Sequence, residues 1–307
     1  MTISNEATWF HPRGALAAPP WETVVDESVP GWAHTGLRVA EIREGETLEL
    51  QDRSVERIIV PLAGSFTVRH RRYPDDTETF LRGRRSVFDG PTDVLYLSAG
   101  SVARIRGEGK VAVAEAPTTE VRPWRHLQPS QFPVELRGAG ASSRQVHNFG
   151  TPEALNAAKL IVCEVITPAQ NWSSYPPHKH DEHIPGHESR LEEIYYFESA
   201  PAGPTGPEIA DDAAFGMFST YSSPAGAIDL NAMVHTGDVA LVPYGYHGPA
   251  VAAPGYDLYY LNVMAGPHEE RAWLISDDPA HAWIRDSWTG QDLDPRLPYT
   301  NDKEGRR

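Results

Sequence analysis

Short apolar segments rich in Val, Ile, Leu and Tyr recur along the chain between clusters of Gly, Pro and Asp. Their length and spacing are typical of β-strands joined by turns, and few stretches carry the 3.6-residue period of an amphipathic helix. One short helix is predicted within 277–288, where acidic residues and a proline stand at the start. The pattern therefore predicts an all-β protein with few short helices. Strands are expected at 37–42, 57–62, 65–69, 94–97, 111–114, 160–166, 193–197, 216–221, 239–242 and 258–264.

Two regions of the chain resemble each other, which indicates a duplicated β unit. Residues 93–102 (Asp-Val-Leu-Tyr-Leu-Ser-Ala-Gly-Ser-Val) align with residues 238–247 (Asp-Val-Ala-Leu-Val-Pro-Tyr-Gly-Tyr-His), so a Val in the first copy stands opposite His247. Upstream, a second pair of apolar stretches places Arg57 opposite Glu193. The two copies therefore share a scaffold but differ in the polar residues that it carries.

Three histidines and a glutamate are spaced so that they could enclose one divalent metal. His178 and His180 are two residues apart, and alternate side chains of a strand point to the same face. His247 follows a Pro and a Gly that form a tight turn, and Glu193 lies on an intervening strand. Such a set leaves open positions on the metal, as a catalytic site requires. We predict a site for Zn²⁺ or Mn²⁺, with Fe²⁺ as a further option.

Two alternatives stay open at this point. Neighbouring residues of a strand face opposite sides, so Glu192 could be the ligand in place of Glu193, although the repeat favours Glu193. The histidines could instead be ordinary residues of a proline-rich loop, which also holds His183 and His187. The combination of His-x-His, a later Glu and a third His in a turn favours the metal site.

Small residues at 138–143 mark a flexible boundary between the two copies. We expect an amino-terminal barrel over 1–137 that lacks metal ligands, because no His-x-His pair precedes Arg57. The metal-binding and catalytic barrel is expected over 138–307.

Composition narrows the choice of partner. A formal net charge of −15 over 307 residues disfavours nucleic acids and anionic membranes, so the expected partner is a small molecule. Cys163 is the only cysteine, the amino terminus has no signal-peptide pattern, and no apolar run reaches membrane-spanning length. These features predict a cytoplasmic protein, and they leave a homo-oligomer open.

The ligand pattern resembles that of the cupin superfamily, small double-stranded β-barrels in which two motifs supply His, His, Glu and then His. The gap from His180 to Glu193 is longer than the general cupin pattern, and only one residue separates Gly245 from His247. Both departures fit the 5-deoxy-glucuronate isomerase family of myo-inositol catabolism. The stretches that resemble this family are 83–90, 144–149, 171–181, 192–197 and 260–267.

This resemblance implies a bicupin, with two jelly-roll barrels, that converts 5-deoxy-D-glucuronate into 5-dehydro-2-deoxy-D-gluconate. Such an aldose–ketose isomerisation moves a proton from C2 to C1, and a metal can polarise the carbonyl and stabilise the enediolate. It also needs a base near C2 and a cationic group for the substrate carboxylate.

Glu164 is the candidate base, because an acid within an apolar strand is expected to face the barrel interior, where burial raises its pKa. Arg144 and Arg190 are the candidates for the carboxylate. The competing interpretations are a Glu164 at the barrel rim and arginines that are solvated or paired with local acids. Lys179 could form a Schiff base, but strand alternation turns it away from the metal and favours a supporting or subunit contact.

Two other functions compete with the isomerase. A barrel that holds Fe²⁺ could act as a dioxygenase, and a sugar-acid-binding protein would need no base near its ligand. Arg144, Arg190 and the Tyr-Pro-Pro-His-Lys-His-Asp motif at 175–181 favour the isomerase.

Overall fold

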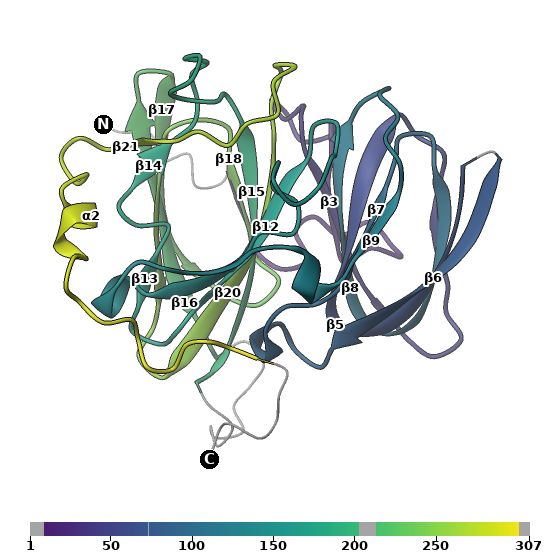
Figure 1. Cartoon of the computed structure of the whole chain (residues 1–307), viewed down its shortest axis with the longest axis horizontal. Coiled ribbons are helices and arrows are strands. Elements are labelled where there is room, and N and C mark those ends of the chain that lie inside the picture. Colours follow the sequence, from purple (N-terminus) through teal and green to yellow (C-terminus); the bar gives the residue numbers. More distant parts are fainter. Residues whose placement is uncertain (1–8, 73, 203–212, 301–307) are drawn as a thin grey trace.

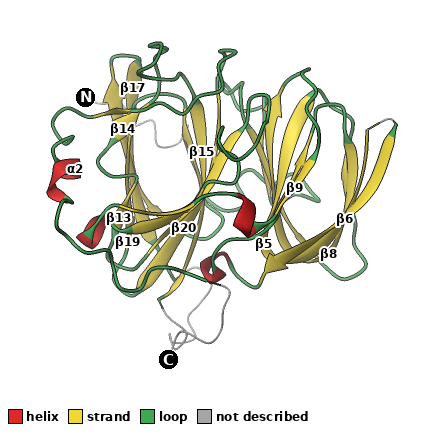
Figure 2. Ribbon diagram, in the orientation of Figure 1, coloured by secondary structure: helices red, strands yellow, loops and turns green. Residues whose placement is uncertain are grey.

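The computed structural model describes residues 9–72, 74–202 and 213–300. Two β-barrels lie side by side, the amino-terminal one in purple and blue and the other in teal to yellow (Figure 1). Strands make up nearly all of the regular structure (Figure 2), so the prediction of an all-β protein is confirmed. No helix among the described residues is long and apolar enough to cross a membrane.

The amino-terminal barrel is one sheet with the strand order β2-β3-β8-β5-β7-β9, while β4 pairs with β8 and β6 with β5. Its longest strands, β5 and β8, pair with each other along most of their length. The bounds of the strands are β2 (Thr23–Val25), β3 (Gly36–Ile42), β4 (Leu48–Leu50), β5 (Val55–Arg72), β6 (Asp75–Arg84), β7 (Val94–Leu97), β8 (Val102–Pro117) and β9 (Arg125–Leu127).

The second barrel is built from two sheets, with the orders β1-β18-β15-β20-β12-β11-β10 and β17-β16-β19-β14-β21, and β13 pairs with β19. The strands are β1 (Phe10–His11), β10 (Val134–Arg137), β11 (Arg144–His147), β12 (Ile161–Thr167), β13 (Trp172–Ser173), β14 (His178–Lys179), β15 (Glu192–Pro201), β16 (Gly216–Ser223), β17 (Gly226–Val234), β18 (Val239–Val242), β19 (Tyr246–Ala252), β20 (Tyr256–Ala265) and β21 (Ser276–Asp277).

Helices are short. Three 3₁₀ turns cover Val87–Asp89, Pro129–Gln131 and Gly140–Ser142. The helix predicted within 277–288 is reduced to α2 (Ile284–Ser287), because the start of that segment, at Asp277, forms strand β21. The capping signals at 277–279 therefore did not mark the start of a helix.

Three apolar clusters form the core. One fills each barrel, and the third, the largest, lies where the two barrels pack against each other. Strand β12 shows the reason, since Cys163 and Val165 point into its own barrel while Val162 and Ile166 point to the other barrel. A strand that is buried on both faces has a continuous apolar sequence. The sequence therefore does not show which side chains face the barrel interior and which face the other barrel.

The register of the sheets confirms the internal repeat. Arg57 pairs with Leu97 in the first barrel, and Glu193 pairs with Val242 in the second, as the alignment of 93–102 with 238–247 requires. The domain division at 137/138 remains a prediction. Strand β1, within 1–137, pairs with β18, and β10 pairs with β11, so sheet pairing crosses that boundary twice.

Two glutamates at equivalent positions hold the barrels together. Glu56 of β5 accepts hydrogen bonds of 2.5 to 2.7 Å from the backbone N–H groups of residues 158–160, directly before β12. Glu192 of β15 accepts hydrogen bonds from the backbone N–H groups of residues 33–35, directly before β3. Each barrel therefore binds the backbone of the other barrel at an equivalent place, directly before β12 or β3.

Candidate metal centre and its cavity

The four predicted ligands meet inside the second barrel. His178 of β14 pairs in register with His247 of β19, His180 follows β14, and Glu193 lies on β15. Donor nitrogens of the three histidines lie within 4.8 Å of one another. Oε2 of Glu193 is 3.0 Å from Nε2 of His180 and 3.1 Å from Nε2 of His247. All four side chains are buried.

Backbone carbonyl groups orient the three imidazoles. When Nδ1–H donates to a carbonyl oxygen, Nε2 keeps its lone pair for a metal. Nε2 of His247 is buried, and Oε2 of Glu193, another candidate ligand, lies 3.1 Å from it, as expected for two atoms that would share a metal. The Nδ1 contacts are His178 to Pro176 O at 3.4 Å, His180 to Leu191 O at 3.1 Å and His247 to Gly245 O at 3.1 Å.

The charges of the cluster suit a cation. Burial alone would raise the pKa of Glu193, but hydrogen bonds from His180 and His247 outweigh it and lower the pKa to about 2. Burial, and then the charges of the two other histidines, lower the pKa of His178 well below its usual value. An ionised carboxylate beside buried imidazoles, with Nε2 atoms that share one centre, fits a divalent metal.

The choice between the two neighbouring glutamates follows from strand alternation. Glu193 faces the histidines, while Glu192 points to the other barrel and accepts the backbone N–H of Thr35 at 2.7 Å. Burial raises the pKa of Glu192, although the hydrogen bonds that it accepts oppose this effect.

A cavity of about 390 Å³ opens beside His178 and Glu193. Arg144, from β11, lines it and is only 4% exposed. Its Nη1 donates to Ser142 O at 2.9 Å, and its guanidinium lies 5.4 Å from the ring centre of Trp288. Burial lowers the pKa of Arg144 to about 10, so it stays charged at neutral pH. Among the described residues, no carboxylate lies within ion-pair distance of this guanidinium, which leaves it available for an anionic ligand.

Arg190 does not lie in this cavity. Its side chain is exposed, and it lines a separate small pocket with Lys159 and His268. The expectation that it binds the carboxylate of a substrate beside the metal is therefore wrong. The reason is tertiary, since Arg190 precedes β15 on the outside of the barrel.

Glu164 is buried, but it faces the other barrel and not the cavity. Its carboxylate accepts hydrogen bonds from Arg84 at 2.6 and 2.8 Å, from His147 at 2.6 Å and from Tyr259 at 2.7 Å. Burial alone would raise its pKa, but the charge of Arg84 and the hydrogen bond from His147 lower it to about 2. Both the expected orientation and the expected rise in pKa are wrong, because an arginine 80 positions away in the sequence supplies the opposite charge.

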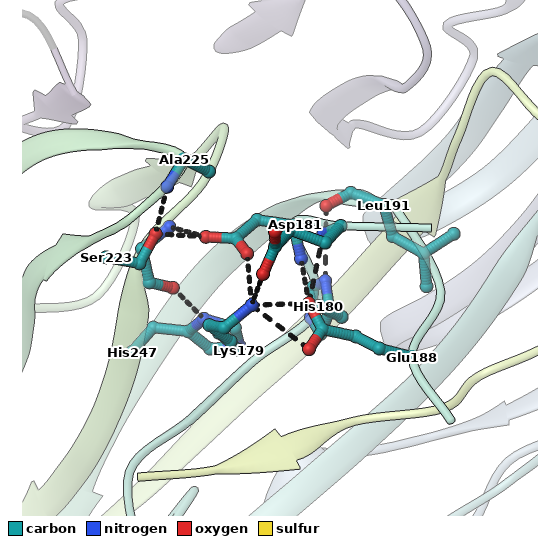
Figure 3. A network of polar contacts seen from close by, with 10 residues as sticks. Lys179, His180, Asp181, Glu188, Leu191, Ser223, Ala225 and His247 are labelled. Atoms are coloured by element: carbon teal, nitrogen blue, oxygen red, sulfur yellow. Dashed lines mark hydrogen bonds and ion pairs between the residues drawn. The ribbon is translucent and has the colours of Figure 1, made fainter. Parts of the chain in front are cut away.

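The ammonium of Lys179 lies among carboxylates and not in the histidine cluster, as strand alternation predicts, and Figure 3 shows its contacts with Asp181 and Glu188. Its ammonium contacts three carboxylates, those of Asp181, Glu182 and Glu188. Burial would lower the pKa of Lys179, but the hydrogen bonds to the three carboxylates raise it. A protonated amine on this face cannot form a Schiff base with a sugar in the cavity.

Several residues that line the cavity were not predicted. They include Arg137, Tyr260, Asn262 and Arg285. Of the tyrosines near the motifs, Tyr175 and Tyr195 line the cavity, and Tyr195 does so because it lies two positions after Glu193 on the same strand face. That alternation also reaches Asn262 of β20, which pairs with Tyr195, but no sequence signal brings Arg285 to the site.

Two barrels in one chain, with a His-rich candidate metal site in the second, define a bicupin. The fold is also that of oxalate decarboxylase from Bacillus subtilis, with a TM-score of 0.58 at 10% identity over 90% of this chain and 80% of the decarboxylase. A family model described as the KduI/IolB family matches residues 11–284, and the chain belongs to this family.

Two relatives are much closer in sequence. The 5-deoxy-glucuronate isomerase of Geobacillus thermodenitrificans is 39% identical over 84% of this chain and 88% of its own length. An IolB-like protein from Salmonella typhimurium LT2 has a TM-score of 0.78 at 32% identity, over 90% of this chain and 98% of its own.

Proposed function

We propose that this protein is a 5-deoxy-glucuronate isomerase, which converts 5-deoxy-D-glucuronate into 5-dehydro-2-deoxy-D-gluconate in myo-inositol catabolism. Membership of the family and the name of the relative in Geobacillus thermodenitrificans support this activity. The observation that carries it in the structure is the cavity in which Arg144, a buried cation with no ion-pair partner among the described residues, stands beside the candidate metal ligands.

His178, His180, Glu193 and His247 would hold one divalent metal, Zn²⁺ or Mn²⁺ by preference. The B. subtilis decarboxylase with the same fold has Mn(II) centres. When bound, the metal would supply a Lewis acid for the C1 and C2 oxygens. Arg144 would hold the carboxylate at the other end of the sugar acid through charge-assisted hydrogen bonds, which would fix the position of C2.

The hydroxyl of Tyr195 would hold an oxygen of the substrate, whereas that of Tyr260 donates to Ser173 Oγ at 2.9 Å. Ser174 Oγ lies 3.3 Å from the hydroxyl of Tyr195 and 3.1 Å from that of Tyr260. Burial raises the pKa of both tyrosines, so they stay neutral and can donate hydrogen bonds. Besides Glu193, the described carboxylate that lines the cavity is Asp277, which pairs with Arg285 at 2.5 and 2.7 Å.

Anaerobic incubation of the metal-loaded protein with 5-deoxy-D-glucuronate tests the proposal. NMR should show the keto product appear without O₂. Consumption of O₂ with no isomerisation would support the dioxygenase instead. Saturable binding without turnover, with Zn²⁺, Mn²⁺ and Fe²⁺ each tried, would support a sugar-acid-binding protein. A cytoplasmic location and a homo-oligomer remain predictions, as does the absence of nucleic-acid and membrane partners.

A further inference from the structure

The residue between the two paired histidines carries an ion cluster of its own. Lys179 is 6% exposed, and its Nζ lies 2.8 Å from Asp181, 2.6 Å from Glu182 and 2.8 and 3.0 Å from Glu188. The three acids could by themselves hold a metal ion, but the ammonium of Lys179 already lies among them. We call Lys179 with these three acids the lysine cage. Figure 3 shows its ammonium beside the carboxylates of Asp181 and Glu188.

The cage folds the segment after His180. Glu188 accepts the backbone N–H of Asp181 at 2.9 Å and that of Glu182 at 3.0 Å, so the loop that follows the histidines is closed on itself. The same carboxylate bonds Lys179, which lies on the strand that carries His178. The His-x-His segment and the loop after it are therefore held as one unit.

Asp181 extends this unit to the third histidine. Its second oxygen accepts the hydroxyl of Ser223 and the backbone N–H of Gly245, the latter at 2.8 Å. The carbonyl oxygen of Gly245 in turn lies 3.1 Å from Nδ1 of His247. The backbone N–H of Gly245 thus donates to Asp181 of the lysine cage, while its carbonyl oxygen orients the imidazole of His247.

No other residue fits at this glycine. Its φ is +97°, and a Cβ there would lie 2.5 Å from Ile228 Cγ2 and 2.8 Å from Tyr221 O. The turn that joins Asp181 to His247 therefore requires a glycine at this position.

We propose that Lys179 is a positioning residue of the metal centre: it holds Asp181, and through Gly245 it fixes the imidazole of His247. The inference rests on the metal site of the proposed function. Without the ammonium, buried carboxylates lie side by side with no cation, and they repel each other. The contact from Asp181 to Gly245 should then loosen, and the ligand nitrogen of His247 should lose its position.

The test is metal affinity, measured by competition with a chromophoric chelator, for Lys179→Met, Lys179→Arg and the wild-type protein. Lys179→Met should bind Zn²⁺ about 10- to 100-fold more weakly, as expected when a contact that orients a ligand is lost. Lys179→Arg keeps the charge and should recover most of the affinity. Lys110→Met is the matched control, because Lys110 pairs with Glu198 at 3.4 Å away from the site and its loss should not change the affinity.

The absorption spectrum of the Co²⁺-loaded protein separates positioning from general stability, since it reports on ligand geometry. It should change in Lys179→Met and stay as in the wild type in Lys110→Met. If Lys179→Met does not fold, Ser223→Ala can replace it. This substitution removes one hydrogen-bond partner of Asp181 at a partly exposed position and should also lower the affinity for Zn²⁺. Wild-type affinity in a folded Lys179→Met, or in Ser223→Ala when that variant replaces it, would overturn the role of Lys179. A wild-type protein that binds no metal would overturn the metal site itself.

Discussion

The two barrels carry different polar residues at the same place in the sheet. In the second barrel, Glu193 belongs to the candidate metal centre. In the first, Arg57 occupies the equivalent strand position and is 1% exposed. Its guanidinium donates to Glu115 at 2.8 Å, to Ser101 O at 2.8 Å and to Gln51 O at 2.9 Å.

The comparison shows two ways to fill one scaffold. In the first barrel, the guanidinium of Arg57 forms hydrogen bonds with the acceptors around it. Val102 occupies the position that His247 has in the second barrel. In the second barrel, the candidate metal ligands would bind an exchangeable metal ion, and a cavity opens beside them. A barrel whose interior position is filled by its own arginine has no room there for a metal that a substrate could reach.

The largest expected effect comes from removal of the metal ligands. His178→Ala and His247→Ala should each abolish stoichiometric metal and lower turnover at least about 1,000-fold, because the Lewis acid contributes several kcal/mol to the reaction. Val102→Ala, at the position equivalent to His247, should retain full metal content. Elemental analysis of the purified proteins decides this, and metal retained in both histidine variants would contradict the site.

Next in size is the loss of the internal cation in the first barrel. Arg57→Met should lower the free energy of unfolding by about 3 kcal/mol, because it leaves Glu115 buried without its closest partner. The effect should stay at the low end for a buried pair, since Arg38 also contacts Glu115, at 3.1 Å. Urea unfolding measures it. Arg69→Met, which breaks an exposed pair with Asp76, is the control and should not change the midpoint. Metal lost from Arg57→Met would break the proposed division of roles.

The guanidinium of Arg144, which has no ion-pair partner among the described residues, should matter for substrate binding and not for the fold. Arg144→Lys should raise KM about 10- to 100-fold, which corresponds to one lost charge-assisted contact. Arg190→Lys should leave KM unchanged because Arg190 lies in a different pocket. Steady-state kinetics on metal-loaded protein tests both. A larger increase in KM for Arg190→Lys than for Arg144→Lys would show that Arg144 is not the residue that binds the carboxylate.

The smallest effect concerns the ion pair between the barrels. The folded pKa of Glu164, about 2, lies below its ordinary value. Its contribution to stability is therefore present above about pH 4.5 and is lost as the pH falls toward 2. Between pH 5 and pH 3 the wild type should lose about 2 kcal/mol more than Glu164→Gln does. Urea unfolding at the two pH values gives this difference. If the free energy of unfolding falls equally in the wild type and in Glu164→Gln, the ionisation of Glu164 does not contribute to stability.

Local patterns were sufficient for the fold and for the cluster of ligands. Strand alternation brings His178 and His180 to one face, and the repeat places Glu193 and His247 at matching positions in their barrel. Alternation failed at Glu164, because both faces of β12 are buried and the sequence does not distinguish interior from interface. It could not identify Arg285 at the cavity, because that contact depends on how the carboxy-terminal segment passes over the barrel.

The paired glutamates at the junction have a consequence for how such a chain can change in evolution. Glu192 and Glu193 are neighbours, so the strand that presents a candidate metal ligand also holds residues 33–35 of the other barrel. Glu56 returns the same contact to residues 158–160. A recombination that exchanged one barrel for that of a distant relative would have to preserve both contacts at once. The two halves are therefore expected to be inherited together, even though only one of them carries the candidate site.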